Sequence, residues 1–267
     1  MAEGRIRAGI GGWTFEPWRG VFYPDDLTQK RELEYASRKL SSIEINGTYY
    51  SSFKPASWAK WRDDTPDGFV FSLKASRYST NRKVLAEAGE SIQRFIGSGI
   101  EELGPKLGPI VWQFAPTKRF DPVDFGAFVD LLPAQVGSMA LRHVLDVRHA
   151  SFKVPEYLAL ARKAKVATVF ADSDEYPSFA DLTAADFVYA RLMRTRAEIE
   201  TGYAAADLDA WAARAQRWAS GHEPADLPRV EAAAPGAGPP RDVFVYFISG
   251  AKERAPAAAM ALIERLG

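Results

Sequence analysis

The chain contains no cysteine and only three histidines among its 267 residues. Without cysteine it can form no disulfide, no thiolate zinc site and no cysteine nucleophile. The three histidines, His143, His149 and His222, are too few for a histidine-rich metal site. The absence of disulfides fits a cytoplasmic protein, since cytosolic thiols are kept reduced.

Long apolar runs and an excess of charge are also missing. No apolar stretch approaches the ~20 residues that a membrane-spanning helix needs, and the N-terminal segment with Arg5 and Arg7 lacks the apolar region of a signal peptide. Lysine plus arginine and aspartate plus glutamate number 34 each, so the formal net charge is +0. Such a balance gives no overall field toward nucleic acid or an anionic membrane. We therefore expect a cytoplasmic protein without a membrane partner.

Short apolar runs, rich in β-branched and aromatic residues, recur along the chain as is typical of buried parallel strands. There are eight: Ile6–Ile10, Ser42–Ile45, Phe69–Leu73, Gly108–Gln113, His143–Asp146, Ala167–Ala171, Phe187–Arg191 and Val243–Ile248. Helix-like segments lie between many of them and after the last: Leu27–Lys39, Lys83–Ile96, Asp121–Leu132, Val154–Lys165, Ala204–Ser220 and Pro256–Leu266.

Alternating strands and helices indicate an α/β protein with a parallel sheet, and eight repeats predict closure into a TIM-type (β/α)8 barrel. We expect one barrel domain over residues 1–267, a usual size for this fold. An open doubly wound sheet is the alternative. The segment Gly221–Arg241, rich in Pro, Ala and Gly, is expected to be a surface excursion or a disordered loop before the last strand.

Polar residues at the C-terminal ends of barrel strands usually form the functional site. The first run ends in Gly11-Gly12-Trp13. Glycines let the backbone approach a ligand closely, and Trp13 either stacks on a sugar or base or packs in the core. The motif after the second run continues as Gly47-Thr48-Tyr49-Tyr50, and both tyrosines are candidates to line a pocket, although one of them is expected to pack in the core instead.

Glu44 and Asn46 alternate along the second run and therefore point to the same side of the strand. A carboxylate inside the barrel is either paired or has a raised pKa. Glu44 is thus the leading candidate for a general acid or base, and a structural salt bridge, with Lys74 as the expected partner, is the alternative. Lys74 ends the third run and could bind an anion, form a Schiff base or serve only that pair.

Gln113, at the end of the fourth run, suits a hydroxyl or amide substrate or a structural hydrogen bond. Asp146 and Arg148 share a face after the fifth run, where Arg148 could clamp a carboxylate or phosphate. His149 titrates near neutrality and is a candidate acid or base. The alternative for this trio is an internal Asp–Arg pair with a capping histidine.

Asp172 and Asp174 follow the sixth run, and one of them is expected to cap the next helix. Arg191 ends the seventh run as a second candidate for anion binding, or as the partner of a neighbouring carboxylate. Glu44, Asp146, Asp172 and His149 could hold Mg²⁺ or Mn²⁺, but no ligand spacing requires a metal. The cofactor is undetermined, and the substrate-binding candidates are Trp13, Asn46, Tyr49, Lys74, Gln113, Asp146, Arg148 and Arg191.

A set of motifs occurs in a fixed order along the chain: Gly11–Trp13, Trp18, Phe22–Pro24, Glu44–Tyr50, Trp58, Thr65-Pro66, Phe69–Lys74, Gln113-Phe114, Arg148-His149 and Tyr246-Phe247. This set resembles a bacterial and archaeal family of uncharacterised TIM-barrel domains, classed as a domain of unknown function. The resemblance covers nearly the whole chain and implies a barrel with a shared pocket, but no reaction.

The chain departs from the family pattern at three places. Asp146 stands where a glutamate is usual, Gly47 where a serine is usual, and Ile248-Ser249 where two asparagines are usual. The last change makes the end of the eighth strand less polar and puts a role for it in question.

Two classes of function follow from these residues. The first is an enzyme that acts on a small anionic or polyhydroxylated substrate, with Glu44 and His149 as catalytic candidates. The second is a non-catalytic barrel that binds an anionic ligand or a nucleic-acid end, for which a local basic pocket would suffice despite the neutral net charge. In either class the expected partner is a small-molecule or phosphate-bearing ligand.

Overall fold

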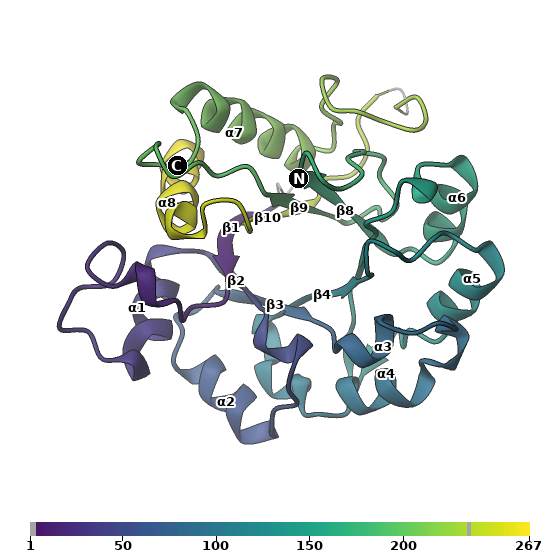
Figure 1. Ribbon diagram of the computed structural model, residues 1–267, viewed down its shortest axis with the longest axis horizontal. Coiled ribbons are helices and arrows are strands. Elements are labelled where there is room, and N and C mark those ends of the chain that lie inside the picture. Colours follow the sequence, from purple (N-terminus) through teal and green to yellow (C-terminus); the bar gives the residue numbers. More distant parts are fainter. Residues whose placement is uncertain (1–3, 234–235) are drawn as a thin grey trace.

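Eight parallel strands close into a barrel in the computed structural model, which describes residues 4–233 and 236–267 (Figure 1). Around the barrel the strands follow the order β1-β10-β9-β8-β7-β4-β3-β2. Their bounds are β1 (Ile6–Gly11), β2 (Ser42–Ile45), β3 (Val70–Lys74), β4 (Leu107–Gln113), β7 (His143–Asp146), β8 (Ala167–Asp172), β9 (Phe187–Leu192) and β10 (Asp242–Phe247). The predicted barrel is confirmed, and every predicted strand end lies within one residue of the observed one.

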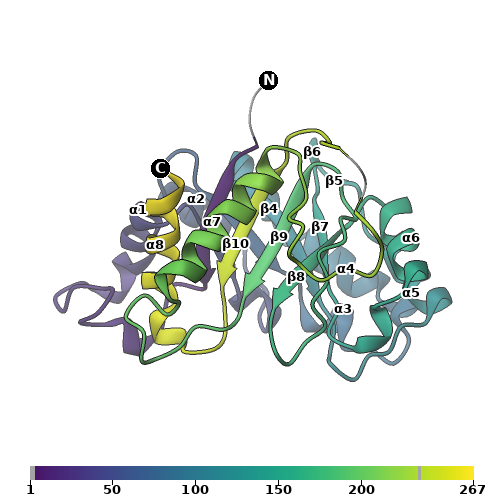
Figure 2. The ribbon, with the colours of Figure 1, turned by 90° about the horizontal axis from the view of Figure 1, so that it is seen from above.

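Helices surround the barrel, as Figure 2 shows from the side. They are α1 (Glu32–Lys39), α2 (Pro55–Asp63), α3 (Arg77–Thr80), α4 (Gly89–Ile96), α5 (Pro122–Asp130), α6 (Pro155–Lys163), α7 (Ala205–Ala219) and α8 (Ala255–Leu266). Two predicted helices are shorter than expected, because 3-10 turns at Gln29–Arg31 and Leu85–Glu87 precede α1 and α4. Helices α2 and α3 and a small hairpin, β5 (Gln135–Val136) with β6 (Met139–Ala140), were not predicted.

The segment expected as an excursion or a disordered loop connects α7 to β10. It forms neither helix nor strand over 221–233 and 236–241, and Leu227 within it is buried. Residues 234 and 235 of the predicted segment lie outside the described residues. No helix in the described part of the chain has both the length and the apolar character to cross a membrane.

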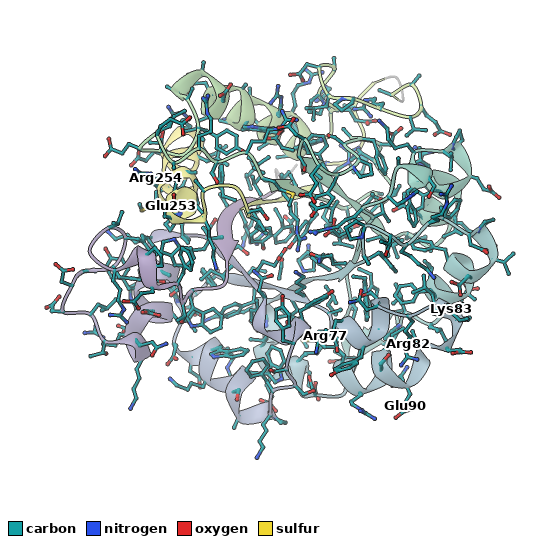
Figure 3. All side chains as sticks on the ribbon, viewed as in Figure 1. Arg77, Arg82, Lys83, Glu90, Glu253 and Arg254 are labelled. Carbon is teal, nitrogen blue, oxygen red and sulfur yellow. The ribbon has the colours of Figure 1, made fainter. Side chains whose placement is uncertain are left out.

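Two apolar layers follow from the alternation of side chains along each strand. Outward-facing residues such as Ile43, Phe71 and Leu145 pack against the helices in the larger cluster. Inward-facing residues such as Val111 and Tyr189 fill the middle of the barrel in a second cluster. The interior is therefore a packed core, and Figure 3 shows side chains filling it.

The N-terminal end of the barrel interior is closed by a cationic and aromatic layer. Arg142 donates to Asp242 over 3.0 Å, and its guanidinium carbon lies 5.1 Å from the centroid of the Phe244 ring. Arg7 lies over the same ring at 5.4 Å and is also close to Asp242. The polar groups available to a ligand inside the barrel thus lie at the other end, where the strands finish.

Candidate functional site

Glu44 lies entirely inside the barrel, with no solvent exposure. Arg191 from β9 donates two hydrogen bonds to its carboxylate, from Nη2 to Oε1 at 2.6 Å and from Nε to Oε2 at 3.1 Å. The hydroxyl of Tyr189 donates to Oε2 over 2.6 Å. The expected Glu44–Lys74 pair is therefore wrong. The planar guanidinium of Arg191 satisfies both carboxylate oxygens at once, which a lysine ammonium cannot do.

The guanidinium of Arg191 also binds the next polar groups along the barrel wall. Its Nη1 donates to Asp146 Oδ2 at 2.6 Å and to Gln113 Oε1 at 3.0 Å. Arg148 approaches the same acceptors from the loop after β7, with Nε 3.1 Å from Asp146 Oδ2 and Nη2 2.8 Å from Gln113 Oε1. Four charged residues thus form one network in which two carboxylates balance two guanidiniums. The sequence left open whether Asp146 and Arg191 bind a ligand or form ion pairs inside the barrel. The ion pairs are what the structure contains.

Lys74 adds a third cation to this network without a carboxylate of its own. Its Nζ lies 4.5 Å from the centroid of the Tyr49 ring, and among the described residues no acceptor lies within hydrogen-bond distance of it. Burial lowers the pKa of Lys74 to about 8, with a further lowering by Arg191 that Glu44 partly offsets. Such an amine changes its charge near neutral pH.

A cavity of about 370 Å³ opens at the C-terminal ends of the strands. We call it the central cavity; it is lined by Gly11, Trp18, Asn46, Tyr50, Lys74, Gln113, Arg148, Phe247, Ile248, Ser249, Lys252 and Ala255. Three of these side chains are cationic, two are amides and, within the described part of the chain, none is a carboxylate. The lining therefore favours an anion over a cation.

Lys252, which sequence reasoning missed, lies in the turn Lys252–Arg254 beyond the last strand. Its Nζ lies 4.3 Å from the ring centroid of Phe15 and 5.5 Å from that of Trp18, and burial lowers its pKa. Trp18 in turn donates from Nε1 to the carbonyl of Lys252 over 3.0 Å. No strand pattern predicts a role for this lysine, because it lies in the turn between β10 and α8 and reaches the cavity only in the folded chain.

The first two strand ends contribute Gly11 and Asn46 to the lining. Gly11 packs so closely against Asn46 that a Cβ there would lie 2.5 Å from the Asn46 Nδ2 atom. Because Gly11 has no side chain, the Asn46 amide has room to lie in the lining. Tyr50 lines the cavity, while Tyr49 instead lies beside the Lys74 amine.

Two further candidates, Trp13 and His149, are absent from the lining of the central cavity, as are Glu44, Tyr49, Asp146 and Arg191. Trp13 is partly buried and packs edge-on against Trp61, with ring centroids 5.2 Å apart, as the core alternative describes, and stacking on a ligand stays a prediction. His149 begins the turn Ala150–Phe152, where its Nδ1 accepts from the Ser151 amide over 3.1 Å. The capping alternative therefore describes His149, which is absent from the cavity lining.

The end of β8 also differs from expectation. Neither Asp172 nor Asp174 caps a helix; Asp172 accepts from the Tyr203 hydroxyl over 3.0 Å, and both approach Arg194. Ser173 stabilises the local turn instead, since its Oγ accepts hydrogen bonds from the backbone amides of Glu175 and Tyr176. Among the described residues, no three His, Asp or Glu side chains are grouped to hold a metal ion. The proposed quartet of Glu44, Asp146, Asp172 and His149 therefore does not converge.

A family model described as "Protein of unknown function DUF72" matches residues 7–267. The chain belongs to the DUF72 family. Its relative in Escherichia coli (strain K12), UPF0759 protein YecE, is 28% identical over 150 residues, which are 55% of this chain and 50% of YecE. The chain thus spans about half the length of the curated relatives it matches.

Two solved DUF72 structures share the barrel. The DUF72 family protein from Thermotoga maritima MSB8 superposes with a TM-score of 0.74 at 21% identity, covering 98% of this chain and 99% of that one. The family protein from Enterococcus faecalis V583 gives 0.69 at 16% identity, covering 98% of both chains. At this identity the likeness concerns the fold, and the resemblance seen in the sequence motifs is confirmed at the level of the family.

Proposed function

We propose that this DUF72 protein is an enzyme that binds a small anion-bearing molecule in the central cavity. The observation that supports this is the lining, in which Lys74 and Lys252 have no carboxylate partner among the described residues, and to which Arg148 adds a third positive charge besides its pairing with Asp146. A phosphate or carboxylate group there would gain charge-assisted hydrogen bonds in a partly buried setting. Asn46 and Gln113 would bind hydroxyl groups of the same molecule, since amides both donate and accept.

In this proposal Lys74 is the general acid or base, which donates a proton to the bound molecule or accepts one from it. An amine with a pKa of about 8 is present in both charge states near neutral pH, as a general acid or base requires. Glu44 has both oxygens occupied by Arg191 and Tyr189, so we assign it a positioning role in place of the catalytic role considered first. Arg191 likewise holds Asp146 and Gln113 in place. We expect the protein to meet its ligand in the cytoplasm.

Calorimetric titration with phosphate and sulfate tests the binding half of the proposal. We expect Lys74→Met and Arg148→Ala to weaken binding about 10-fold or more, the effect of removing one charged hydrogen-bonding partner worth ~1.5–3 kcal/mol. Lys163→Met is the matched control, because Lys163 is exposed on α6 and the substitution removes the same charge. Equal affinity in all four proteins would remove the central cavity as the anion site.

Turnover tests the enzymatic half. A panel of sugar phosphates and hydroxy acids, followed by NMR, should include a compound that the wild type converts and folded Lys74→Met does not. Conversion by Lys74→Met at the wild-type rate would overturn the proton-transfer role. Binding of the whole panel without any conversion would favour the non-catalytic barrel.

A further inference from the structure

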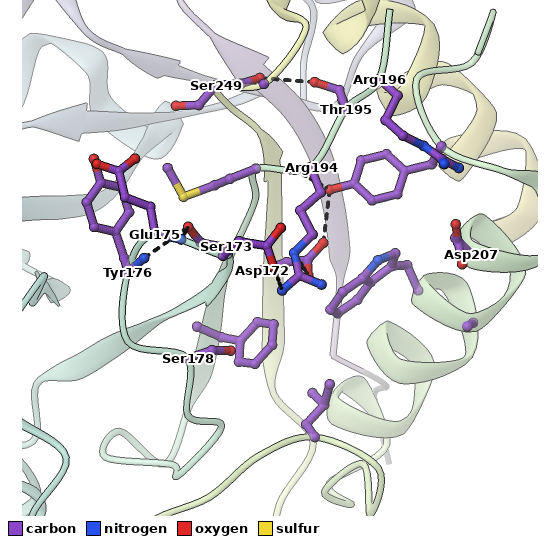
Figure 4. Close-up of a pocket in the computed structure, with 18 of the residues that line it drawn as sticks. Asp172, Ser173, Glu175, Tyr176, Ser178, Arg194, Thr195, Arg196, Asp207 and Ser249 are labelled. Carbon is purple, nitrogen blue, oxygen red and sulfur yellow. Dashed lines mark hydrogen bonds and ion pairs between the residues drawn. The ribbon is translucent and has the colours of Figure 1, made fainter. Parts of the chain in front are cut away.

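A second, larger cavity of about 870 Å³ lies beside the central one, between the ends of β8 and β9 and helix α7 (Figure 4). We call it the flanking cavity. Asp172 lies in its wall, almost buried, where it accepts from the Tyr203 hydroxyl and faces Arg194 Nε at 3.4 Å. Trp211 from α7 contributes a buried aromatic side chain to the same wall.

The two cavities adjoin each other. Ser249 lines both, and its carbonyl accepts from the Thr195 hydroxyl over 3.0 Å, the contact drawn in Figure 4. Ser249 has φ of +69°, a conformation that side-chain-bearing residues adopt at a cost and often near functional sites. Arg148, in the central lining, lies with its guanidinium carbon 4.3 Å from the ring centroid of Tyr176, in the flanking lining. Ser249 and the Arg148–Tyr176 pair thus connect the two linings.

The linings differ in charge. In the flanking cavity the carboxylates of Asp172, Asp174, Glu175 and Asp207 are interspersed with the guanidiniums of Arg194, Arg196 and Arg214. Interspersed charges of both signs favour neither an anion nor a cation. Carboxylates and guanidiniums both present paired hydrogen-bonding atoms, which match adjacent hydroxyl groups. An aromatic ring such as that of Tyr176 supplies an apolar face for the C–H side of a sugar ring.

We infer that one ligand occupies both cavities, and that it is a sugar carrying a phosphate or carboxylate group. The anionic group lies in the central cavity and the hydroxyl-bearing ring extends past the Arg148–Tyr176 pair into the flanking cavity. The inference rests on the proposed function and narrows its substrate class. It also assigns a positioning role to Tyr176, which holds the guanidinium of Arg148 at the boundary.

The test compares inorganic phosphate with glucose 6-phosphate, mannose 6-phosphate, fructose 6-phosphate and ribose 5-phosphate by calorimetry on the full chain. We expect at least one sugar phosphate to bind 10-fold tighter than phosphate. Asp172→Asn should remove that gain while leaving phosphate affinity unchanged. Glu175→Gln, at an exposed position of the same lining, repeats the test where Asp172→Asn disturbs folding. Asp209→Asn is the matched control, since Asp209 pairs with Arg265 outside both cavities.

The outcomes separate the two proposals. Phosphate binding that depends on Lys74, without any gain from the sugar, would overturn the shared ligand and leave the central cavity as an anion site. A sugar-dependent gain that survives in Asp172→Asn and Glu175→Gln would also overturn it. Failure of phosphate itself to bind would overturn the proposed function.

Discussion

Arg191 holds both carboxylate oxygens of Glu44 inside the barrel, at 2.6 and 3.1 Å, with neither side chain reaching solvent. The pair joins β2 to β9 across the interior and orients the guanidinium that also binds Asp146 and Gln113. The layer beneath the central cavity is therefore fixed before any ligand arrives, while Lys74 and Lys252 in the cavity lining have no carboxylate partner among the described residues.

Replacing Glu44 by glutamine should destabilise the protein strongly. The substitution keeps the shape but leaves a buried guanidinium without one of its carboxylates, a loss of about 3–5 kcal/mol for buried pairs. Denaturant unfolding measures it. Glu90→Gln is the control, because the Glu90–Arg94 pair is exposed, with side-chain exposures of 83% and 72%, and should contribute less than about 1 kcal/mol. Similar losses in both variants would contradict a stabilising role for the Glu44–Arg191 pair.

Gln113→Glu should separate stability from binding. The Gln113 oxygen already accepts from Arg191 and Arg148, so a carboxylate there strengthens both hydrogen bonds and should leave the melting temperature unchanged or raised. The same negative charge lies in the central lining and should weaken sulfate binding several-fold. A melting scan and a titration give the two results. Sulfate binding as tight as in the wild type would show that charge in this lining does not govern anion affinity.

Tyr246→Phe should lower the stability of the protein without changing its affinity for sulfate. The Tyr246 hydroxyl lies 2.5 Å from Ser42 Oγ and 2.6 Å from Ser72 Oγ in the buried interior below the central cavity. Its removal leaves buried hydroxyls with fewer partners and should cost about 1–2 kcal/mol in the free energy of unfolding. Sulfate affinity should stay at the wild-type value. An unchanged free energy of unfolding would mean that these hydroxyl contacts contribute no net stability.

The sequence predicted the strands well because each is a short apolar run bounded by turn residues. Glu44, Lys74, Gln113 and Arg148 could be expected near one another, since parallel strand ends meet on one side of a barrel. Which cation meets Glu44 could not be predicted. That choice depends on register across the barrel, where Gly11 pairs with Glu44 and Tyr246 with Arg191.

Features outside the strands were harder to predict. Lys252 reaches the central cavity from a turn after β10, and Tyr176 reaches Arg148 from the loop after β8. Helix α2 was missed although it begins with proline, a common first residue of helices, because its mixed sequence carries little apolar periodicity. Residues in loops and turns show no hydrophobic periodicity, so the sequence alone does not predict where their side chains lie.

The pH dependence of sulfate binding tests the central claim most directly, because sulfate keeps its charge between about pH 6 and 10. Lys74 faces the cations Arg191 and Arg148 and the carboxylates Glu44 and Asp146, and its pKa lies near 8 when no ligand is bound. Its lowered pKa means that the folded protein releases this proton at a lower pH than the unfolded chain. The positive charge that attracts the anion is therefore present below about pH 8 and lost as the pH rises through that value.

Calorimetric titrations with sulfate at intervals from about pH 6 to 10 should show wild-type affinity falling above about pH 8. In Lys74→Met the affinity should be weaker at neutral pH and nearly constant across this step, while Lys163→Met should follow the wild type. Sulfate binding with the same strength and pH profile in Lys74→Met as in the wild type would contradict the claim that Lys74 holds an anion in the central cavity.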